Sequence, residues 1–154
     1  KVNATMAAVA AIFQGYEEVI NIGSCGSKNH PLGEILKIGR VYQDIDATPL
    51  CEYGLTPFEE ALPYILLDEK SNVSCFTTDY FYDEKQQNKY ADRYLQMVNT
   101  ASVFDMELYA IAKACMQHKV SCTAYKWVSD DGNYDHWVDN CKASLDLLLH
   151  TIQL

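Results

Sequence analysis

Two stretches decide the fold: Val103-Phe104-Asp105-Met106-Glu107, where an apolar strand turns into a helix, and Lys126-Trp127-Val128-Ser129-Asp130, where an apolar strand ends in an acid. They place two carboxylates, Glu107 and Asp130, at the ends of neighbouring strands. In open α/β sheets, small ligands bind in the crevice beyond the carboxyl ends of the strands. Both acids are therefore candidates for chemistry.

The length and charge of the chain restrict its class. Its 154 residues, 49% of them hydrophobic, are enough for one ordinary core, so we expect a single domain over residues 1–154. The net charge of −9 would repel a phosphate backbone, which argues against nucleic acid as a partner. No apolar run reaches the roughly 18 residues of a membrane span, so we expect a cytoplasmic protein without a membrane partner.

The metal-binding residue types are scattered along the chain. The six cysteines form no CxxC pair, and the four histidines stand at no ligand spacing from one another or from the cysteines. We therefore predict no metal and no cofactor, and expect most cysteines to be buried thiols.

Apolar periodicity predicts an alternation of helices and strands. The expected helices cover residues 2–14, 83–98, 106–117 and 137–152, and the expected strands cover residues 18–23, 34–47 with a bend at Gly39, 73–77, 102–104 and 122–128. Residues 48–63 hold three of the four prolines and should form a loop. This order predicts an α/β fold with a mostly parallel or mixed central sheet and helices on both faces.

The helix expected over residues 137–152 is amphipathic. Its predicted inner face consists of Val138, Cys141, Leu145, Leu148, Leu149 and Ile152.

A pair of carboxylates suits the cleavage of an N-glycosidic bond to a purine. One acid protonates the departing base, and one carboxylate near the sugar hydroxyls stabilises the positive charge that develops on the ribose. Glu107 and Asp130 meet these two needs.

Seven segments in order carry a resemblance to a known family. They are Lys1-Val2-Asn3-Ala4, Asn21-Ile22-Gly23-Ser24-Cys25-Gly26, Leu36-Lys37-Ile38-Gly39, Asp44-Ile45-Asp46-Ala47-Thr48, Thr78-Asp79-Tyr80-Phe81, Asp105-Met106-Glu107 followed by Ala110 and Ala112, and Val128-Ser129-Asp130. In these the chain resembles the purine nucleoside phosphorylase superfamily, and within it the methylthioadenosine/S-adenosylhomocysteine nucleosidases. The resemblance implies a nucleoside phosphorylase-like fold that lacks the family's N-terminal strand, so we expect the chain to be truncated at its N-terminus.

The resemblance also implies catalytic roles. Asp130 falls on the aspartate that protonates the purine at N7, supported by Ser129. Glu107 falls on the glutamate that binds the ribose hydroxyls, and Met106 lies under the sugar.

Further positions match residues that bind the substrate. Phe81 falls on the aromatic residue that stacks on the base, and Tyr82 on the position whose backbone reads the purine edge. By the same resemblance, Ser24, Cys25 and Gly26 form the loop near the attacking water or phosphate, Trp137 covers the base, and Tyr53 lies near the rim of the site.

We therefore expect a hydrolase that releases adenine from methylthioadenosine or S-adenosylhomocysteine, with a purine nucleoside as its small-molecule partner. The alternatives are a phosphorylase that uses phosphate and an inactive relative that only binds nucleosides. The resemblance also implies a homo-oligomer, with a dimer favoured.

Overall fold

The structure is a computed structural model that describes residues 1–141 and residue 150. The helices are α1 (Val2–Phe13), η1 (Glu84–Lys89, a 3-10 helix), α2 (Asp92–Thr100), α3 (Leu108–His118) and α4 (Tyr134–Asn140). The strands are β1 (Glu18–Gly26), β2 (Ile35–Lys37), β3 (Arg40–Gln43), β4 (Ile65–Leu66), β5 (Ser74–Thr77), β6 (Val103–Asp105) and β7 (Ser121–Asp130). None of the helices in this part of the chain is long and apolar enough to cross a bilayer.

Within the described residues, seven strands form one mixed sheet in the order β2-β7-β1-β6-β5-β3-β4. β1 and β7 run parallel from the Glu18–Ser121 pair to the Cys25–Val128 pair, and β5 pairs in parallel with both β3 and β6. β2 and β4 join the two edges antiparallel. The expectation of a mixed sheet is confirmed. β1 pairs antiparallel with β6 at Gly26 and Phe104, so the carboxyl ends of β1, β6 and β7 lie close together near the middle of the sheet.

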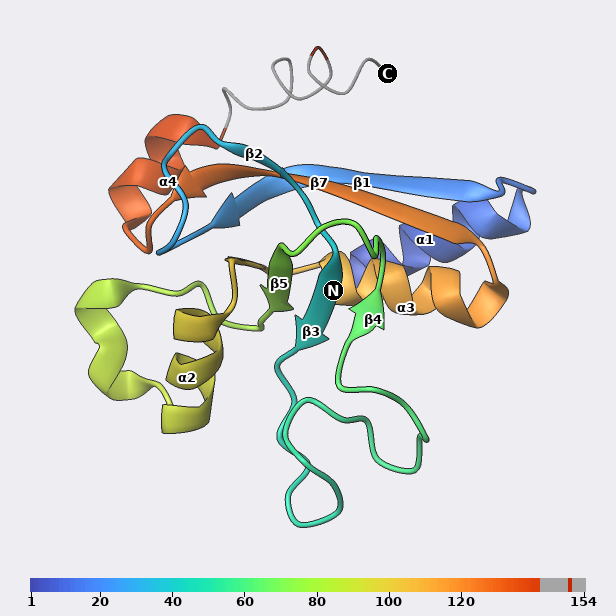
Figure 1. Cartoon of the computed structure of the whole chain (residues 1–154), viewed down its shortest axis with the longest axis horizontal. Helices are drawn as coiled ribbons and strands as arrows, with labels where there is room; N and C mark the ends of the chain where they lie inside the picture. Colours follow the sequence, from blue (N-terminus) through green and yellow to red (C-terminus); the bar gives the residue numbers. More distant parts are fainter. Residues whose placement is uncertain (142–149, 151–154) are drawn as a thin grey trace.

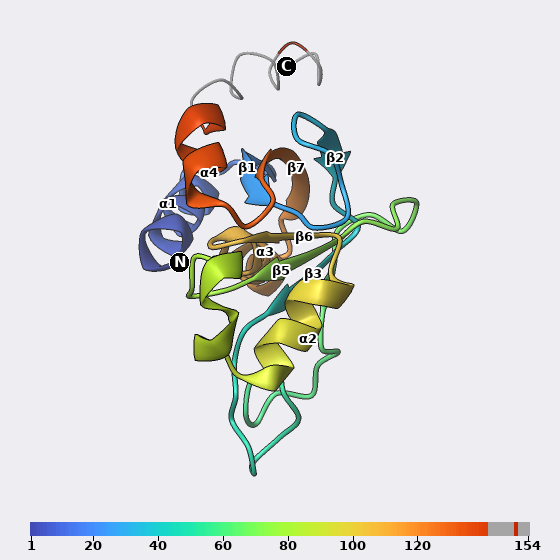
Figure 2. The same ribbon diagram turned by 90° about the vertical axis from the view of Figure 1, so that its left-hand side faces the viewer.

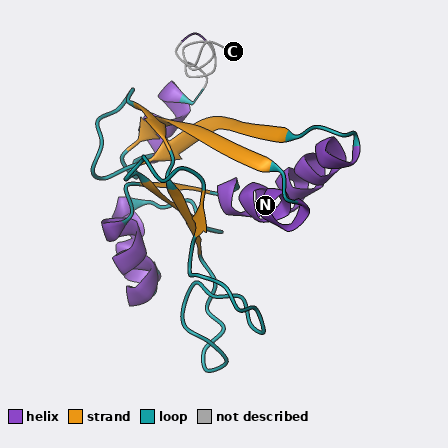
Figure 3. Cartoon of the chain, turned by 45° about the vertical axis from the view of Figure 1, so that its right-hand side comes forward, coloured by secondary structure: helices purple, strands orange, loops and turns teal. Residues whose placement is uncertain are grey.

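Alternate residues of the central strands enter two different cores. Cys75 of β5 and Val103 of β6 pack in the core beneath α3, whereas the following residues, Phe76 and Phe104, pack in an aromatic core beneath α2. α1 packs against α3, and these two helices lie together on the right in Figure 1, while α2 and α4 lie away from them (Figures 1 and 2). Helices therefore cover both faces of the sheet, as expected, and Figure 3 shows the strands between them.

Several element boundaries differ from the prediction. β1 continues through Gly26, where the sequence predicted a loop from residue 23, and β7 continues to Asp130. Gly, Ser and Cys carry little strand preference of their own, but the two strands satisfy each other's backbone groups along their length. The two-residue strand β4 was not predicted.

The helix expected over residues 83–98 is two helices separated by extended backbone at Tyr90 and Ala91. Asp83 caps η1 by accepting a hydrogen bond from the Lys85 backbone N–H at 2.9 Å. Tyr90 contacts the rings of Tyr82 and Tyr94 in the aromatic core. This tertiary contact overrides the local helical preference.

The last predicted helix begins earlier than expected, at Tyr134, because the Asn133 side chain caps it by accepting from the Asp135 backbone N–H. Val138 was expected to face inward, but its side chain is 47% exposed. The remaining predicted inner positions, Leu145, Leu148, Leu149 and Ile152, lie outside the described residues.

The C-terminal cap of α3 gives a stability prediction. Lys119 has φ 58° and ψ 35°, a left-handed conformation that disfavours a Cβ. Lys119→Gly is expected to raise the free energy of unfolding by about 0.5–1 kcal/mol, measured by urea denaturation. Lys119→Ala keeps the Cβ and is the matched control, so equal stability of the Gly and Ala variants would contradict the explanation.

Candidate functional site

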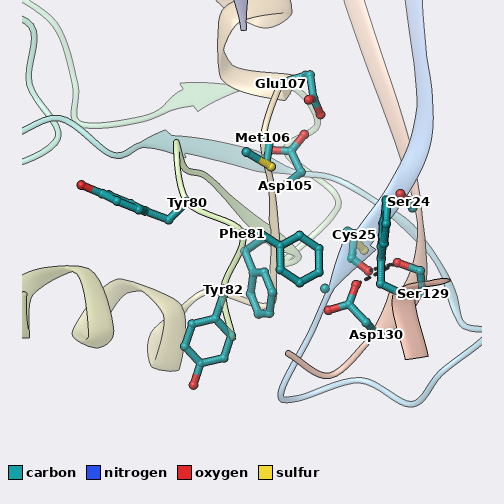
Figure 4. Close-up of a pocket in the computed structure, with 13 residues that line it drawn as sticks. Ser24, Cys25, Tyr80, Phe81, Tyr82, Asp105, Met106, Glu107, Ser129 and Asp130 are labelled. Atoms are coloured by element: carbon teal, nitrogen blue, oxygen red, sulfur yellow. Dashed lines mark hydrogen bonds between the residues drawn. The ribbon is translucent and has the colours of Figure 1, made fainter. Parts of the chain in front are cut away.

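A pocket of about 180 Å³ lies at the carboxyl ends of β1, β6 and β7 (Figure 4). It is lined by Ser24, Cys25, Gly26, Tyr80, Phe81, Tyr82, Phe104, Asp105, Met106, Glu107, Ser129, Asp130 and Trp137. The structure therefore brings together every site residue that the sequence predicted except Tyr53. Glu107 and Met106 lie at one end of the pocket and Asp130 and Ser129 at the other, with Phe81 between them.

Tyr53, predicted near the rim of the site, is not among the residues that line this pocket. Its hydroxyl contacts the Asp44 carboxylate, and its ring packs against the aromatic core beneath α2. Burial, together with the bond to Asp44, raises the pKa of the Tyr53 phenol. The ring contributes to packing rather than to the pocket.

Asp130 is a buried acid at the end of β7. It is 3% exposed, and its Oδ1 accepts a hydrogen bond from the Gly132 backbone N–H at 3.0 Å. Burial is the main cause that raises the pKa of Asp130, and the charge of neighbouring Asp131 raises it further. A carboxyl group with a raised pKa keeps its proton to higher pH, as a general acid requires.

Ser129 is a hydrogen-bond partner of the Asp130 carboxyl group, and when its hydroxyl donates to the carboxylate it lowers the pKa of Asp130. The Ser129 Oγ lies 2.9 Å from the Asp130 Oδ2 and 3.1 Å from the backbone oxygen of Cys25. A hydroxyl has one hydrogen, so Ser129 donates to only one of these oxygens at a time. When it donates to Cys25, its own oxygen is free to accept a bond from the protonated carboxyl group.

Gly26 makes room for the acid. A Cβ at this position would lie 2.0 Å from Phe104 Cε2 and 2.8 Å from Asp130 Oδ1. This close approach of β1 to Phe104 and Asp130 is possible only because residue 26 has no side chain. Next to it, the Cys25 thiol is buried, and burial raises its pKa, so it is not a ready nucleophile.

Glu107 is an exposed carboxylate at the N-cap position of α3, yet its side chain makes no capping hydrogen bond. The Asp105 side chain caps the helix instead, because its Oδ2 accepts from the Leu108 backbone N–H at 2.8 Å. Glu107 is therefore left available for a ligand, at the positive end of the α3 dipole.

Three aromatic rings stand together beside the pocket. Phe81 meets Trp137 with ring centroids 5.6 Å apart and Tyr134 at 5.9 Å, and Tyr134 lies 5.7 Å from Trp137. Phe81 and Trp137 line the pocket, so their rings are exposed to any planar molecule that enters it. Tyr134 was not predicted, because it precedes the expected helix.

Tyr82 packs against Gly132 and so joins the segment that carries Phe81 to the loop after Asp130. Tyr82 is 2% exposed, and a Cβ at Gly132 would lie 2.6 Å from Tyr82 Cε1. The Glu84 backbone N–H also donates to the Gly132 oxygen at 3.1 Å. The two segments therefore pack without an intervening side chain.

The pocket also contains residues that sequence reasoning did not select. Asp105, Phe104 and Tyr80 line it in addition to the predicted set. The two-residue alternation of side chains along a strand could have predicted that Asp105 is buried, since Val103 and Asp105 lie on the same face of β6. Over the described residues, no group of three or more His, Cys, Asp or Glu side chains is placed to hold a metal ion.

Fold and pocket together define an α/β protein with a pocket of small-molecule size at the carboxyl ends of its strands. The family model described as the phosphorylase superfamily matches residues 1–150, and the chain belongs to this superfamily. A comparison with curated proteins finds no match.

Solved structures with the same fold include enzymes that cleave nucleosides. The 5′-methylthioadenosine/S-adenosylhomocysteine nucleosidase from Helicobacter pylori, with butyl-thio-DADMe-Immucillin-A, has a TM-score of 0.81 at 19% identity over 99% of this chain and 75% of that chain. The futalosine hydrolase of Helicobacter pylori has a TM-score of 0.78 at 21% identity, over 94% and 70%. The nucleosidase from Colwellia psychrerythraea, in complex with adenine, has a TM-score of 0.79 at 22% identity, over 94% and 68%.

Proposed function

We propose that this protein hydrolyses the N-glycosidic bond of a purine nucleoside and releases the base. The observation that carries the proposal is that one pocket holds a buried acid with a raised pKa, Asp130, and an uncapped carboxylate, Glu107. Phe81 lies between them (Figure 4), and Trp137 also lines the pocket, so two aromatic side chains offer contacts for a planar base.

In the proposed reaction, Asp130 donates a proton to N7 of the purine while the bond between C1′ and N9 breaks. The bonding electrons leave with the base, so positive charge develops on the ribose. Glu107 accepts hydrogen bonds from the ribose hydroxyls and stabilises that charge electrostatically. Water then adds to C1′ and loses a proton, which restores the proton of Asp130.

The charge of the pocket favours water over phosphate as the acceptor. Glu107 lines it as an exposed carboxylate, and no Lys or Arg lines it among the residues described. The nearby Lys126 ammonium is already paired with the Asp105 carboxylate at 2.8 Å. A phosphate dianion in this pocket would therefore meet the negative charge of Glu107 without an unpaired cation in the lining.

We propose a 5′-substituted adenine nucleoside of the methylthioadenosine or S-adenosylhomocysteine type as the substrate. The similarity to nucleosidases that were solved with an adenosine analogue and with adenine supports this class. The test is adenine release from 5′-methylthioadenosine by the chain, with and without phosphate. Equal rates and free sugar as product support hydrolysis, a requirement for phosphate indicates a phosphorylase, and adenine binding without turnover indicates a binding protein.

We further propose that the chain forms a homodimer through α1. Its outer side chains Val2, Met6 and Phe13 are 73%, 66% and 77% exposed, a run of apolar surface that a second copy would cover. Sedimentation of the wild type and of Met6→Glu tests this proposal. A monomeric wild type would contradict it.

The raised pKa of Asp130 predicts two pH effects. The acid must be protonated to act, so the rate of base release should fall as the pH rises through the pKa of Asp130. In the folded protein the pKa of Asp130 lies above the ordinary value of 3.8. At neutral pH the ionised side chain therefore lowers the free energy of unfolding. At a pH low enough to protonate Asp130 in both the folded and the unfolded protein, this effect disappears.

Asp130→Asn is therefore expected to be more stable than the wild type at pH 7, with the difference disappearing as the pH falls below about 3.8. Urea denaturation at several pH values measures this difference. A constant difference over the whole range would show that Asp130 does not titrate with a raised pKa.

A further inference from the structure

A fully buried ion pair lies beneath the pocket. The Lys126 Nζ is 2.8 Å from the Asp105 Oδ2, and the two side chains are 2% and 1% exposed. Lys126 lies on β7 four residues before Asp130, and Asp105 ends β6 two residues before Glu107. β1 separates these strands in the sheet, so the ion pair connects β6 and β7 across it.

Asp105 also holds the first turn of α3. Its Oδ1 accepts from the Thr77 hydroxyl at 2.6 Å, and its Oδ2 accepts from the Leu108 backbone N–H at 2.8 Å. The Thr77 Oγ1 in turn accepts from the Tyr109 backbone N–H at 2.9 Å. Glu107 lies between two anchored residues, Asp105 and Leu108, so the direction of its side chain depends on this network.

Both members of the pair are charged. Burial alone would raise the pKa of Asp105, but Lys126 and the hydrogen bonds hold it below its usual value. Burial alone would lower the pKa of Lys126, but Asp105 raises it. A buried ion pair often adds little net stability, because desolvation offsets the attraction. Its geometric effect on the pocket is therefore the more informative one.

We propose that Lys126 is a positioning residue for the proposed reaction: through Asp105 it holds Glu107 at a fixed place relative to Asp130. The inference rests on the proposed function. Without the ammonium, the Asp105 carboxylate would be buried without a counter-ion and would protonate or move. The turn that carries Glu107 would then shift, and a displacement of about 1 Å can lower a rate about 100-fold.

The test compares Lys126→Met with the wild type in the full chain. The readouts are kcat and KM for 5′-methylthioadenosine, and the Kd values of adenine and of the nucleoside by calorimetry. Adenine contacts the end of the pocket near Asp130 and Phe81, so its Kd should change less than about threefold. In the proposed binding mode the nucleoside also contacts Glu107, so kcat/KM for the nucleoside should fall about 100-fold. The affinity for the nucleoside should fall more than the affinity for adenine.

Two further variants keep the test decisive. If Lys126→Met does not fold, the double variant Lys126→Met/Asp105→Asn removes both charges and leaves no unpaired ion in the core. It should bind adenine and still turn over the nucleoside slowly. Lys37→Met is the matched control, because Lys37 forms its 2.6 Å ion pair with Asp68 on the surface, and its kinetics should equal those of the wild type.

The outcomes separate positioning from a purely structural role. If Lys126 only stabilises the fold, the affinities for adenine and for the nucleoside should fall in the same proportion, or the folded double variant should have the kinetics of the wild type. Either result would overturn the proposal. A wild type that binds the nucleoside without cleaving it would overturn the proposed function alone, because the ratio of the two affinities still reports on Glu107.

Discussion

Asp130→Asn is expected to lower the rate of base release by about 100- to 10,000-fold, the usual contribution of a general acid. The amide has nearly the same shape and can still accept the 3.0 Å hydrogen bond from the Gly132 backbone N–H. It cannot transfer a proton to N7. We therefore expect kcat to fall while the Kd of adenine changes little, measured by an adenine release assay and calorimetry.

The neighbouring acid is the matched control for this substitution. Asp131 is exposed and forms a 3.0 Å ion pair with His136, so Asp131→Asn removes one negative charge beside the pocket without removing the acid. Its rate should remain within a few-fold of the wild type. If Asp130→Asn and Asp131→Asn have similar rates, Asp130 is not the general acid.

Gly26→Ala is expected to destabilise the protein by about 1–3 kcal/mol, the range for overpacking a core. The new Cβ would lie 2.0 Å from Phe104 Cε2 and 2.8 Å from Asp130 Oδ1, so both side chains must move. Base release should fall with the displacement of Asp130. Urea denaturation and the adenine assay measure the two effects.

Gly23→Ala on the same strand is the control for this prediction. Its Cβ would lie 3.4 Å from the Lys126 Nζ, an ordinary van der Waals distance, and would meet no other atom within 4 Å. The free energy of unfolding should change much less than in Gly26→Ala. Equal losses would mean that β1 rejects any side chain, and that the contact with Phe104 and Asp130 is not the cause.

The alternation of apolar segments predicted the central strands and α3. Buried strands require continuous apolar runs, and a helix with one buried face requires apolar residues at helical spacing, so both patterns can be read from the sequence. The alternation could not predict β4, which has two residues and exists only through its pairing with β3. It also missed the break at Tyr90, where the ring enters the aromatic core and the backbone becomes extended. In both cases contacts between distant segments decide the local structure.

The lining of the pocket could be predicted where a side chain follows the end of a strand. Asp130 and Glu107 follow their strands, and both line the pocket. Tyr53 does not line it, because the position of an aromatic residue in a loop depends on contacts with distant segments. The ion pair of Asp105 with Lys126 joins strands that are not neighbours, so its geometry depends on the order of the sheet.

The packing of Gly132 against Tyr82 has a consequence for how this pocket can vary among relatives. A side chain at position 132 would occupy the space that the Tyr82 ring fills. Gly132 also has φ 91°, a backbone conformation that residues with a side chain rarely adopt. A relative with any side chain at the position of Gly132 should therefore carry a smaller residue than tyrosine at the position of Tyr82. Substitutions in the segment that carries Tyr82 and in the loop that follows Asp130 should therefore occur together.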